Sequence, residues 1–447
     1  MANKYSTVRL GDFAESVSIT HDFKKNTVIF LNTSDIYLGD FLHSIYGNVD
    51  GLPGQAKKTI KQFDILFSEI RPANGRWAFV EKEETDDYVV STKLMVIRTK
   101  SARLHPKYLY YFLTAPETVS WLQVLAESRS GTFPQITFDQ VAGLDLPLPP
   151  LDTQILISHQ VESLDKKISL NRRINQTLEA MAQAIFKSWF VDFDPVKAKI
   201  AAIEQGKDPL RAAMRAISGK TDAELDQMPR EHHHQLATTA ALFPDAMEES
   251  ELGEIPKGWR NEAIGCYFDL TMGQSPPGNT YNETGEGMPF YQGRTDFGAR
   301  FPTERVYCTA PTRLAKKGDV LVSVRAPVGD INVAVSDCAI GRGVAAVRYK
   351  HPSFALYVLR HQEPAFKRFE SDGTVFGSIN KKQFESLPFV VAPDELVRRF
   401  QSLVGPLDEK IEGNEWQMRN IAILRDTLLP KLLSGELPVD NFTAENV

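Results

Sequence analysis

The sequence predicts an α+β fold in which two globular α/β domains alternate with two long α-helices that pack as an antiparallel coiled-coil spacer. Three observations predict it. The second half of the 447-residue chain repeats motifs of the first half, which indicates an internal two-fold repeat. Segments with short apolar runs alternate with segments of helical periodicity. Within the helical segments, apolar residues recur on a seven-residue pattern, which is typical of a helix that buries a seam against another helix.

The internal repeat rests on blocks that keep their order along the chain. Five blocks match. Two of them are DILFS at 64–68 followed by Arg71 and Pro72, which matches DVLVS at 319–323 followed by Arg325 and Pro327, and SLDKKI at 163–168 followed by Asn171, which matches PLDEKI at 406–411 followed by Asn414. One such match can arise by chance, whereas several in the same order indicate duplication of a single unit.

Five segments follow from these patterns. In chain order they are a first globular domain at 1–150, a helical region at 151–194, a helical insert and linker at 195–256, a second globular domain at 257–393, and a second helical region with a C-terminal tail at 394–447. In the globular domains, apolar runs bounded by Gly, Pro and Asn predict strands, and Pro106 to Leu113 and Ser353 to Arg360 predict helices. The insert at 198–242 is rich in Ala, Gln and Lys, and the pattern leaves open whether it packs on the helices or contacts a partner.

Each helical region carries a predicted seam. The seam residues are Leu164, Ile168, Asn171, Leu178 and Ile185 in the first region, and Leu407, Ile411, Asn414, Ile421 and Leu428 in the second. A buried asparagine fixes the register of paired helices, although an Asn at this position is also compatible with solvent where two helices diverge. About forty helical residues span roughly 60 Å, so a pair of such helices would act as a rigid spacer.

Charge and composition exclude several classes of protein. The net charge of −6 is uneven: the strand-rich domains carry −1 and +4, and the remaining two parts, at 151–256 and 394–447, carry −5 and −4. No apolar run approaches the roughly 18 residues of a membrane span, and the polar amino terminus does not resemble a secretory signal. The three cysteines, Cys266, Cys308 and Cys338, lack the spacing of a disulfide framework or a zinc site, which favours a cytoplasmic protein.

Motifs for covalent chemistry or metal binding are not convincing. The GRGVAA segment at 341–346 resembles a phosphate-binding turn, but a strand-turn-strand fits it better because no adequate helix follows. The GLPGQAKKT segment at 51–59 lacks the glycine that a Walker A loop places before its lysine. The histidines at 232–234 have no second pair of ligands nearby, so a solvated helix face is the better interpretation. We therefore expect neither a catalytic residue nor a metal site.

Polar and basic loops of the two domains are instead candidates for nucleic-acid contacts. In the first domain they contain Lys57, Lys58, Arg71, Asn74, Arg76, Arg129, Ser130, Thr132 and Gln135. In the second they contain Gln274, Ser275, Tyr281, Gln292, Arg294, Thr295, Arg300, Arg325, Arg342, Ser378 and Lys381. Such side chains bind base edges or phosphates, although surface loops are polar in most proteins and each residue taken alone is weak evidence.

Several phrases give the chain a resemblance to a known family. They are SWFVDFDP at 188–195, LGEIPKGW at 252–259, DVLVS at 319–323 with Arg325 and Gly329, and LLPKLLSG at 428–435. With the alternation of globular and helical parts, they make the whole chain resemble the DNA sequence-specificity (S) subunit of type I restriction-modification systems.

The resemblance implies a subunit that recognises double-stranded DNA without modifying or cutting it. Each target-recognition domain would bind one half of a bipartite, asymmetric sequence, and the helices would set the distance between the halves. The implied partners are two methyltransferase (M) subunits, which use S-adenosylmethionine for adenine methylation, and restriction/translocase (R) subunits, which use ATP and Mg²⁺. No cofactor would bind this chain, and no membrane is involved.

Physical arguments support this division, and two alternatives stay open. Two DNA-binding domains on one rigid body bind cooperatively when the spacer matches the separation of the half-sites. Because the first domain carries no positive excess, we expect weak DNA binding by the isolated chain. The alternatives are a protein scaffold that does not recognise a DNA sequence, and an enzyme whose catalytic motif escapes recognition.

Overall fold

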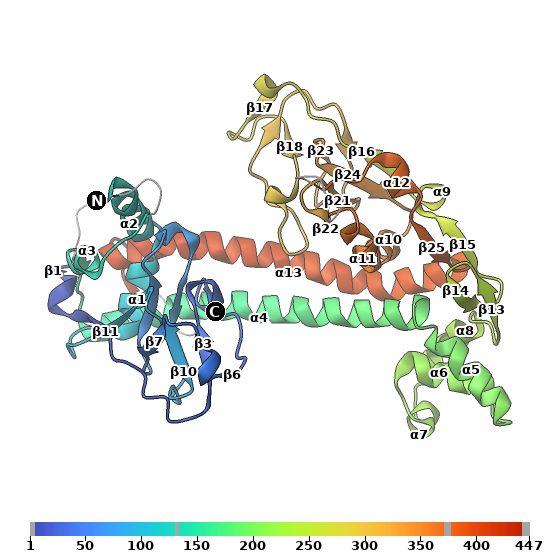
Figure 1. The fold of residues 1–447 in the computed structure, drawn as a ribbon, viewed down its shortest axis with the longest axis horizontal. Coiled ribbons are helices and arrows are strands. Elements are labelled where there is room, and N and C mark those ends of the chain that lie inside the picture. Colours follow the sequence, from blue (N-terminus) through green and yellow to red (C-terminus); the bar gives the residue numbers. More distant parts are fainter. Residues whose placement is uncertain (1–4, 130–133, 371–376, 440–447) are drawn as a thin grey trace. The chain divides into compact units, whose positions relative to one another are not determined.

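The computed structural model describes residues 5–129, 134–370 and 377–439 (Figure 1). The chain forms two compact units: unit 1 comprises 1–172 and 414–447, and unit 2 comprises 173–413. Both long helices, α4 (Leu151–Phe190) and α13 (Asp394–Ser434), continue from one unit into the other. Each unit therefore contains one strand-rich domain and part of each helix.

Unit 1 contains two four-stranded sheets. Its elements are β1 (Thr7–Arg9), β2 (Ala14–Val17), β3 (Thr27–Leu31), β4 (Ile36–Tyr37), β5 (Asp40–Phe41), β6 (Gly47–Asn48), β7 (Ala56–Thr59), β8 (Ile65–Ser68), β9 (Trp77–Phe79), β10 (Tyr88–Ser91), β11 (Leu94–Thr99), α1 (Pro106–Thr114), α2 (Pro116–Arg129), α3 (Phe138–Ala142) and β12 (Asp145–Pro147). The sheets have the orders β2-β11-β8-β9 and β6-β3-β10-β7, and β1 pairs with β12.

Unit 2 repeats this plan and adds the helical insert. Its elements are α5 (Asp194–Glu204), α6 (Pro209–Ser218), α7 (Asp222–Asp226), α8 (Arg230–Ala241), β13 (Met247–Ser250), β14 (Gly253–Pro256), β15 (Arg260–Ala263), α9 (Ile264–Tyr267), β16 (Asp269–Met272), β17 (Tyr281–Asn282), β18 (Met288–Tyr291), β19 (Tyr307–Cys308), β20 (Leu314–Ala315), β21 (Val320–Val324), β22 (Val328–Val333), β23 (Cys338–Ile340), β24 (Val344–Arg348), α10 (Pro352–His361), α11 (Glu363–Lys367), α12 (Lys381–Glu385) and β25 (Pro388–Val391). The sheets have the orders β16-β24-β21-β22 and β17-β19-β18-β23-β20, and β15 pairs with β25.

The predicted duplication is confirmed by the matching strand orders and by a matching buried ion pair. In unit 1, Asp64 accepts two hydrogen bonds of 2.7 Å from Arg98 on β11. In unit 2, Asp319 accepts bonds of 2.8 and 2.6 Å from Arg348 on β24. Both aspartates are almost fully buried, and each also accepts a backbone N–H three residues earlier. The same carboxylate thus stabilises the same pair of strands in each copy.

The cores join each domain to the long helices. In unit 1, the aromatic helix α1 packs in one cluster with Ile157 and Val161 of α4 and Leu432 of α13. In unit 2, Phe354 of α10 packs with Phe186 of α4 and Phe400 of α13. Because these aromatic and branched side chains are buried, burial of apolar surface fixes each domain on its part of the helices.

The long helices are antiparallel within each unit. In unit 1, Asn171 donates to Gln417 at 2.7 Å and Asp165 accepts from Arg425 at 2.8 Å, so the residue numbers rise on one helix as they fall on the other. In unit 2, Asn175 donates to the Ile411 carbonyl. Of the predicted seam residues, three are buried and the others are half-buried; the buried ones are Asn171, Ile411 and Asn414.

The insert forms a small helical subdomain on unit 2. Helices α6, α7 and α8 enclose a core of Ala213, Met214, Leu225 and Ala240. The subdomain is fixed to the end of α4, where Trp189 meets the edge of Phe243 at 5.4 Å between ring centroids. The question that the sequence left open is therefore answered for the chain itself: the insert packs on the helices.

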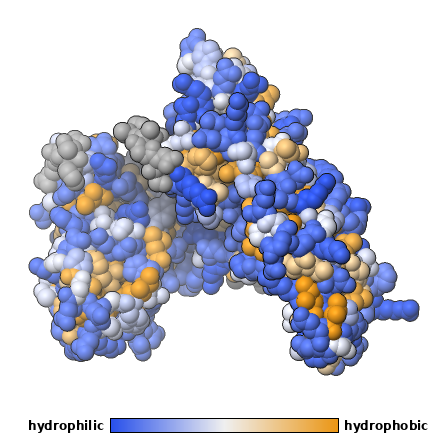
Figure 2. All heavy atoms as spheres, turned by 45° about the vertical axis from the view of Figure 1, so that its right-hand side comes forward, coloured by the Kyte–Doolittle hydropathy of each residue, from blue (hydrophilic) through white to orange (hydrophobic). Residues whose placement is uncertain are grey.

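Figure 2 shows a mostly hydrophilic face on which hydrophobic residues gather in separate patches. Within the described part of the chain, no helix is both long and apolar enough to cross a membrane, and no group of His, Cys, Asp or Glu residues is arranged to hold a metal ion.

Candidate nucleic-acid interface

Two equivalent loops bring together several of the predicted contact residues. In unit 1, the loop between β8 and β9 forms a bridge from Ile70 to Gln135, and the Arg71 amide donates to the Pro134 carbonyl at 3.1 Å. In unit 2, the loop between β21 and β22 forms a bridge from Arg325 to Ser378, and the Ala326 amide donates to the Gly377 carbonyl at 3.2 Å. The scaffold is the same, whereas the exposed side chains differ.

These loops hold a strained backbone in both copies. Arg71 has a φ of 44° and Ala326 has a φ of 27°, which places both in the left-handed region that side chains seldom adopt. Such strain persists only where surrounding contacts fix the backbone, and it concentrates at functional sites. The backbone bridges to Gln135 and Ser378 supply those contacts.

The polar residues of the unit 1 loop have different environments. Arg71 and Asn74 are exposed, and within the described part of the chain the Arg71 side chain makes no ion pair. Arg76 is half-buried and donates to the Ser34 and Ile36 carbonyls at 3.0 and 3.1 Å. Arg71 and Asn74 can therefore contact a ligand, while the Arg76 guanidinium stabilises the neighbouring segment.

Lys57 and Lys58, which the sequence predicts in a basic loop, lie instead on strand β7 and on opposite sides of it. Lys57 is exposed. Lys58 is buried, and its ammonium group donates to the Thr92 and Leu94 carbonyls at 3.1 and 2.8 Å. Burial lowers the pKa of Lys58. The position fits an internal hydrogen-bonding role better than contact with a phosphate.

Three further predicted residues concern the segment at 129–133. Arg129 ends α2, while Ser130 and Thr132 lie outside the described residues.

A second group of predicted residues gathers on adjacent loops of unit 2. The Arg342 guanidinium and amide both approach the Ser275 hydroxyl at 3.3 Å. The Gly343 amide donates to the Gln292 carbonyl at 3.1 Å, and the Gly343 carbonyl accepts from Val324, next to Arg325. Gln274, Gln292, Arg325 and Arg342 are exposed. The strand-turn-strand predicted at 341–346 is confirmed, because β23 ends at Ile340 and β24 begins at Val344.

The remaining residues of unit 2 are more dispersed. Thr295 is exposed, Arg294 pairs with Asp330 at 2.6 Å, and the half-buried Tyr281 donates to the Pro276 carbonyl at 2.7 Å. Lys381 is exposed at the start of α12 and lies 3.4 Å from Glu385.

Arg300 belongs to a buried network that the sequence did not reveal. Only 7% of Arg300 is exposed; it pairs with Glu179 of α4 and, at 2.6 Å, with Asp408 of α13. Tyr357 also donates to Asp408 at 3.2 Å. Burial raises the pKa of Tyr357 and lowers that of Arg360, which pairs with Glu179 as well. These groups join the second domain to both helices.

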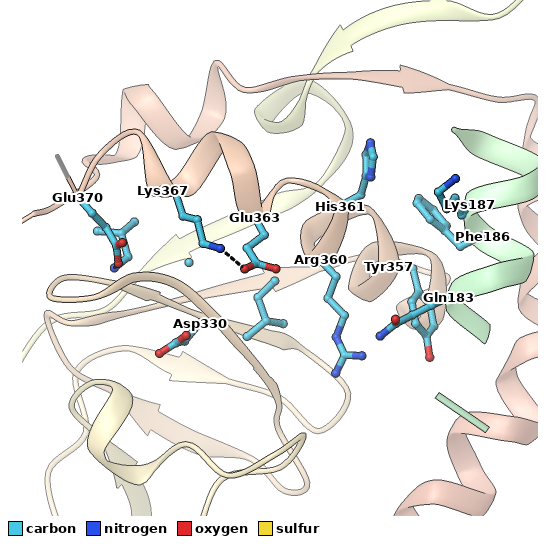
Figure 3. A pocket seen from close by; sticks show the side chains of 13 residues that line it. Gln183, Phe186, Lys187, Asp330, Tyr357, Arg360, His361, Glu363, Lys367 and Glu370 are labelled. Carbon is cyan, nitrogen blue, oxygen red and sulfur yellow. Dashed lines mark hydrogen bonds and ion pairs between the residues drawn. The ribbon is translucent and has the colours of Figure 1, made fainter. Parts of the chain in front are cut away.

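A cavity of about 480 Å³ lies beside this network (Figure 3). It is lined by residues of α4, β22, α10 and α11, and its charged groups have partners. Lys367 pairs with Glu363 at 2.7 Å, and Lys187 pairs with Asp192. Because its charged side chains are already paired, we interpret the cavity as a structural groove between the second domain and α4.

Comparison with known proteins identifies the family. The profile described as "Type I restriction modification DNA specificity domain" matches residues 3–180. The chain is 37% identical, over 96% of its own length and 98% of the relative's, to the "Type I restriction enzyme HindI specificity subunit" of Haemophilus influenzae. The chain belongs to the family of type I restriction-modification specificity subunits.

Other members of the specificity-subunit family are more distant. The putative MjaX specificity subunit of Methanocaldococcus jannaschii is 27% identical over 84% of this chain and 79% of the relative. A solved type I S subunit from M. genitalium, 14% identical over 96% of both chains, has a TM-score of 0.54 and shows the same fold. The specificity subunit therefore has the mixed helical and sheet fold predicted from its sequence.

Some structural residues of this specificity subunit could have been found in the sequence. The repeated Leu-Asp of the helices contains both Asp165 and Asp408, and the repeat also contains both Asp64 and Asp319. Arg98, the partner of Asp64, and Arg348, the partner of Asp319, belong to no recognisable motif. These two ion pairs therefore become visible only in the fold.

Proposed function

We propose that this chain is the non-catalytic subunit that gives a type I restriction-modification enzyme its DNA specificity, and that each domain recognises one half of a bipartite, asymmetric sequence. The observation that carries the proposal is the pair of equivalent loops, at 70–76 bridged to Gln135 and at 325–327 bridged to Ser378. One scaffold that presents different side chains in its two copies suits recognition of two different half-sites.

The chemistry of the exposed residues fits double-stranded DNA. Arginine can form two hydrogen bonds to guanine, and asparagine or glutamine can form two to adenine, each good pair discriminating by about 1–3 kcal/mol. Arg71 and Asn74 would serve the first domain, and Arg325, Arg342 and Gln292 the second. Lys57 would hold a phosphate.

The proposal assigns chemistry and cofactors to partner subunits. Two methyltransferase subunits would bring S-adenosylmethionine, and restriction/translocase subunits would bring ATP and Mg²⁺; the assembly would act on cytoplasmic DNA. Apolar side chains that are exposed on α13, such as Trp416 at 43% and Ile423 at 65%, would contact a partner helix. Methylation inside a duplex requires a flipped adenine, which needs the partner's active site.

The test is to map methylated adenines in the DNA of cells that carry the chain with its methyltransferase partner. We expect a bipartite motif, of which only one half changes when residues 1–150 are replaced by another recognition domain. Arg325→Ala should weaken recognition of the other half. A formed complex that methylates without any sequence motif would instead favour a scaffold, and methyl transfer by the purified chain alone would indicate an enzyme.

A further inference from the structure

A hairpin in unit 1 presents two hydrophobic side chains beside the candidate DNA-binding loop. Strands β4 and β5 pair antiparallel, with Tyr37 opposite Asp40, so Leu38 and Gly39 form a two-residue turn. Tyr37 is 46% exposed and Leu38 is 49% exposed. The tip of the hairpin therefore offers apolar surface where turn residues are normally polar or glycine.

The turn holds Leu38 in a strained backbone conformation. Leu38 has a φ of 46° and Gly39 a φ of 101°, and asparagine followed by glycine is the pair that usually adopts such a turn. The surrounding chain maintains the strain: the Leu38 amide donates to the Gly75 carbonyl at 2.8 Å, and the Gly39 amide donates to the Trp77 carbonyl at 3.0 Å. The leucine side chain is thus exposed and held in one place, at a turn position whose backbone conformation favours asparagine.

The tip directly contacts the loop that contains Arg71 and Asn74. A Cβ on Gly75 would lie 2.9 Å from the Leu38 side chain, so the loop approaches the hairpin closely only because this residue is glycine. The Arg76 guanidinium lies over the Tyr37 ring, 5.3 Å from its centroid. The apolar tip and the polar loop form one continuous surface.

The charges around this surface fit DNA. Of the two acids of the hairpin, Asp40 forms an ion pair with Arg172 at 2.8 Å, and the Asp35 carboxylate accepts a hydrogen bond from the Asn32 backbone amide at 2.8 Å. Arg71 is exposed and has no ion-pair partner within the described part of the chain. The hairpin carboxylates are thus held by donors of this chain, one of them a cation, and the Arg71 guanidinium is available to a polyanion.

We propose that the β4–β5 tip is an apolar recognition element of the first domain, in which Leu38, with Tyr37 beside it, packs against the 5-methyl group of a thymine in the major groove. Thymine is the base that offers a methyl group to apolar side chains there. The inference rests on the proposed function, and it adds a determinant that makes no hydrogen bond to the base.

The test compares two substitutions in the full chain, assembled with its methyltransferase partner. Leu38→Asn removes the apolar side chain but suits the turn, so the variant should unfold at the same temperature as the wild type or above it. Phe63→Asn is the matched control, because Phe63 is also exposed, at 52%, and also has a positive φ, of 70°, but precedes β8 at the end opposite the loop.

We expect Leu38→Asn to relax the methylation motif at one thymine-containing position of one half-site, and Phe63→Asn to leave the motif unchanged. In binding assays, replacing that thymine by uracil should weaken the wild-type complex about fourfold, as expected for one buried methyl group, and should not weaken the Leu38→Asn complex.

Two results would overturn the inference. One is an unchanged motif in the Leu38→Asn variant with normal assembly of the complex. The other is an unchanged motif together with less complex on gel filtration, which would make the tip a docking surface for a protein. If the wild-type complex itself shows no motif, the proposed function fails, and this outcome is distinct from both.

Discussion

One buried aspartate in each domain holds an arginine of a neighbouring strand by two hydrogen bonds. The Asp64 side chain is fully buried and that of Arg98 is 23% exposed, whereas Arg348, the partner of Asp319, is 44% exposed. Removing one member of such a pair leaves the other without compensation, and the cost grows with burial. The two copies of the repeat therefore differ in how much they depend on the same contact.

We predict that Asp64→Asn lowers the free energy of unfolding of unit 1 by about 2 kcal/mol, and that Asp319→Asn has a smaller effect on unit 2. Both changes in the free energy of unfolding can be measured by urea titration of the full chain, with hydrogen exchange used to monitor unfolding in each unit separately. Asp86→Asn, at an exposed site of the first domain, is the control and should match the wild type. Equal effects at both aspartates would contradict the argument from burial.

The neighbouring lysines of β7 give a prediction on pH. Burial lowers the pKa of Lys58 below its ordinary value of 10.5. At pH values between the lowered pKa and 10.5, Lys58 is therefore protonated in the unfolded chain and deprotonated in the folded chain. The free energy of unfolding contributed by Lys58 therefore rises with pH in that interval. Lys58→Met should show a flatter dependence than the wild type in urea titrations, and Lys57→Met should keep the wild-type slope. Equal slopes in all three proteins would show that Lys58 is not desolvated.

Single residues were the hardest feature to predict from the sequence. Adjacent strand residues face opposite sides, and the sequence does not decide which of Lys57 and Lys58 faces solvent. Arg300 lies in a polar loop, but its partners Glu179 and Asp408 are more than a hundred residues away in the chain. Pairing over such distances depends on tertiary packing and not on a local pattern.

The long helices were predicted well because their seven-residue pattern extends over many turns. Helix α4 begins at Leu151, where the first helical region was predicted, and α13 begins at Asp394, where the second was predicted. The β4–β5 hairpin was not anticipated. Its strands have two residues each, and Leu38 at the turn contradicts the usual turn signal, so only the backbone reveals it.

For the helix seam we predict that a charge at Ile411 or Ile168 lowers assembly with the methyltransferase subunits. Ile411 is 3% exposed and Ile168 is half-buried, so Ile411→Asp should have the larger effect, destabilising the helix pair by about 3 kcal/mol. Gel filtration of the mixed subunits measures the complex, and Lys410→Asp at the exposed neighbouring position is the control. Normal assembly by both isoleucine variants would show that the seam does not support the complex.

At the scale of the whole molecule, charge limits what the chain can do alone. The net charge of −6 disfavours a polyanion, and the first domain, at −1, has no positive excess to attract one. The exposed cations of the candidate interface in the first domain, Lys57 and Arg71, are few. Sequence recognition can therefore reside in this chain while most of the phosphate contacts come from its partners.

We accordingly predict that the isolated chain binds its target duplex at least about tenfold more weakly than the complex with methyltransferase subunits does, and with a shallower dependence on salt. In the complex, the double variant Lys57→Gln, Arg71→Gln should reduce the slope of log K against log salt concentration by about one, since the single phosphate contact of Lys57 contributes about 0.9, and should lose discrimination between duplexes, since Arg71 binds a base edge. Fluorescence anisotropy over a range of salt concentrations measures both quantities. If Arg71 binds a phosphate instead, the slope falls by about two and discrimination between duplexes is kept, so the same titration separates a base contact from a phosphate contact.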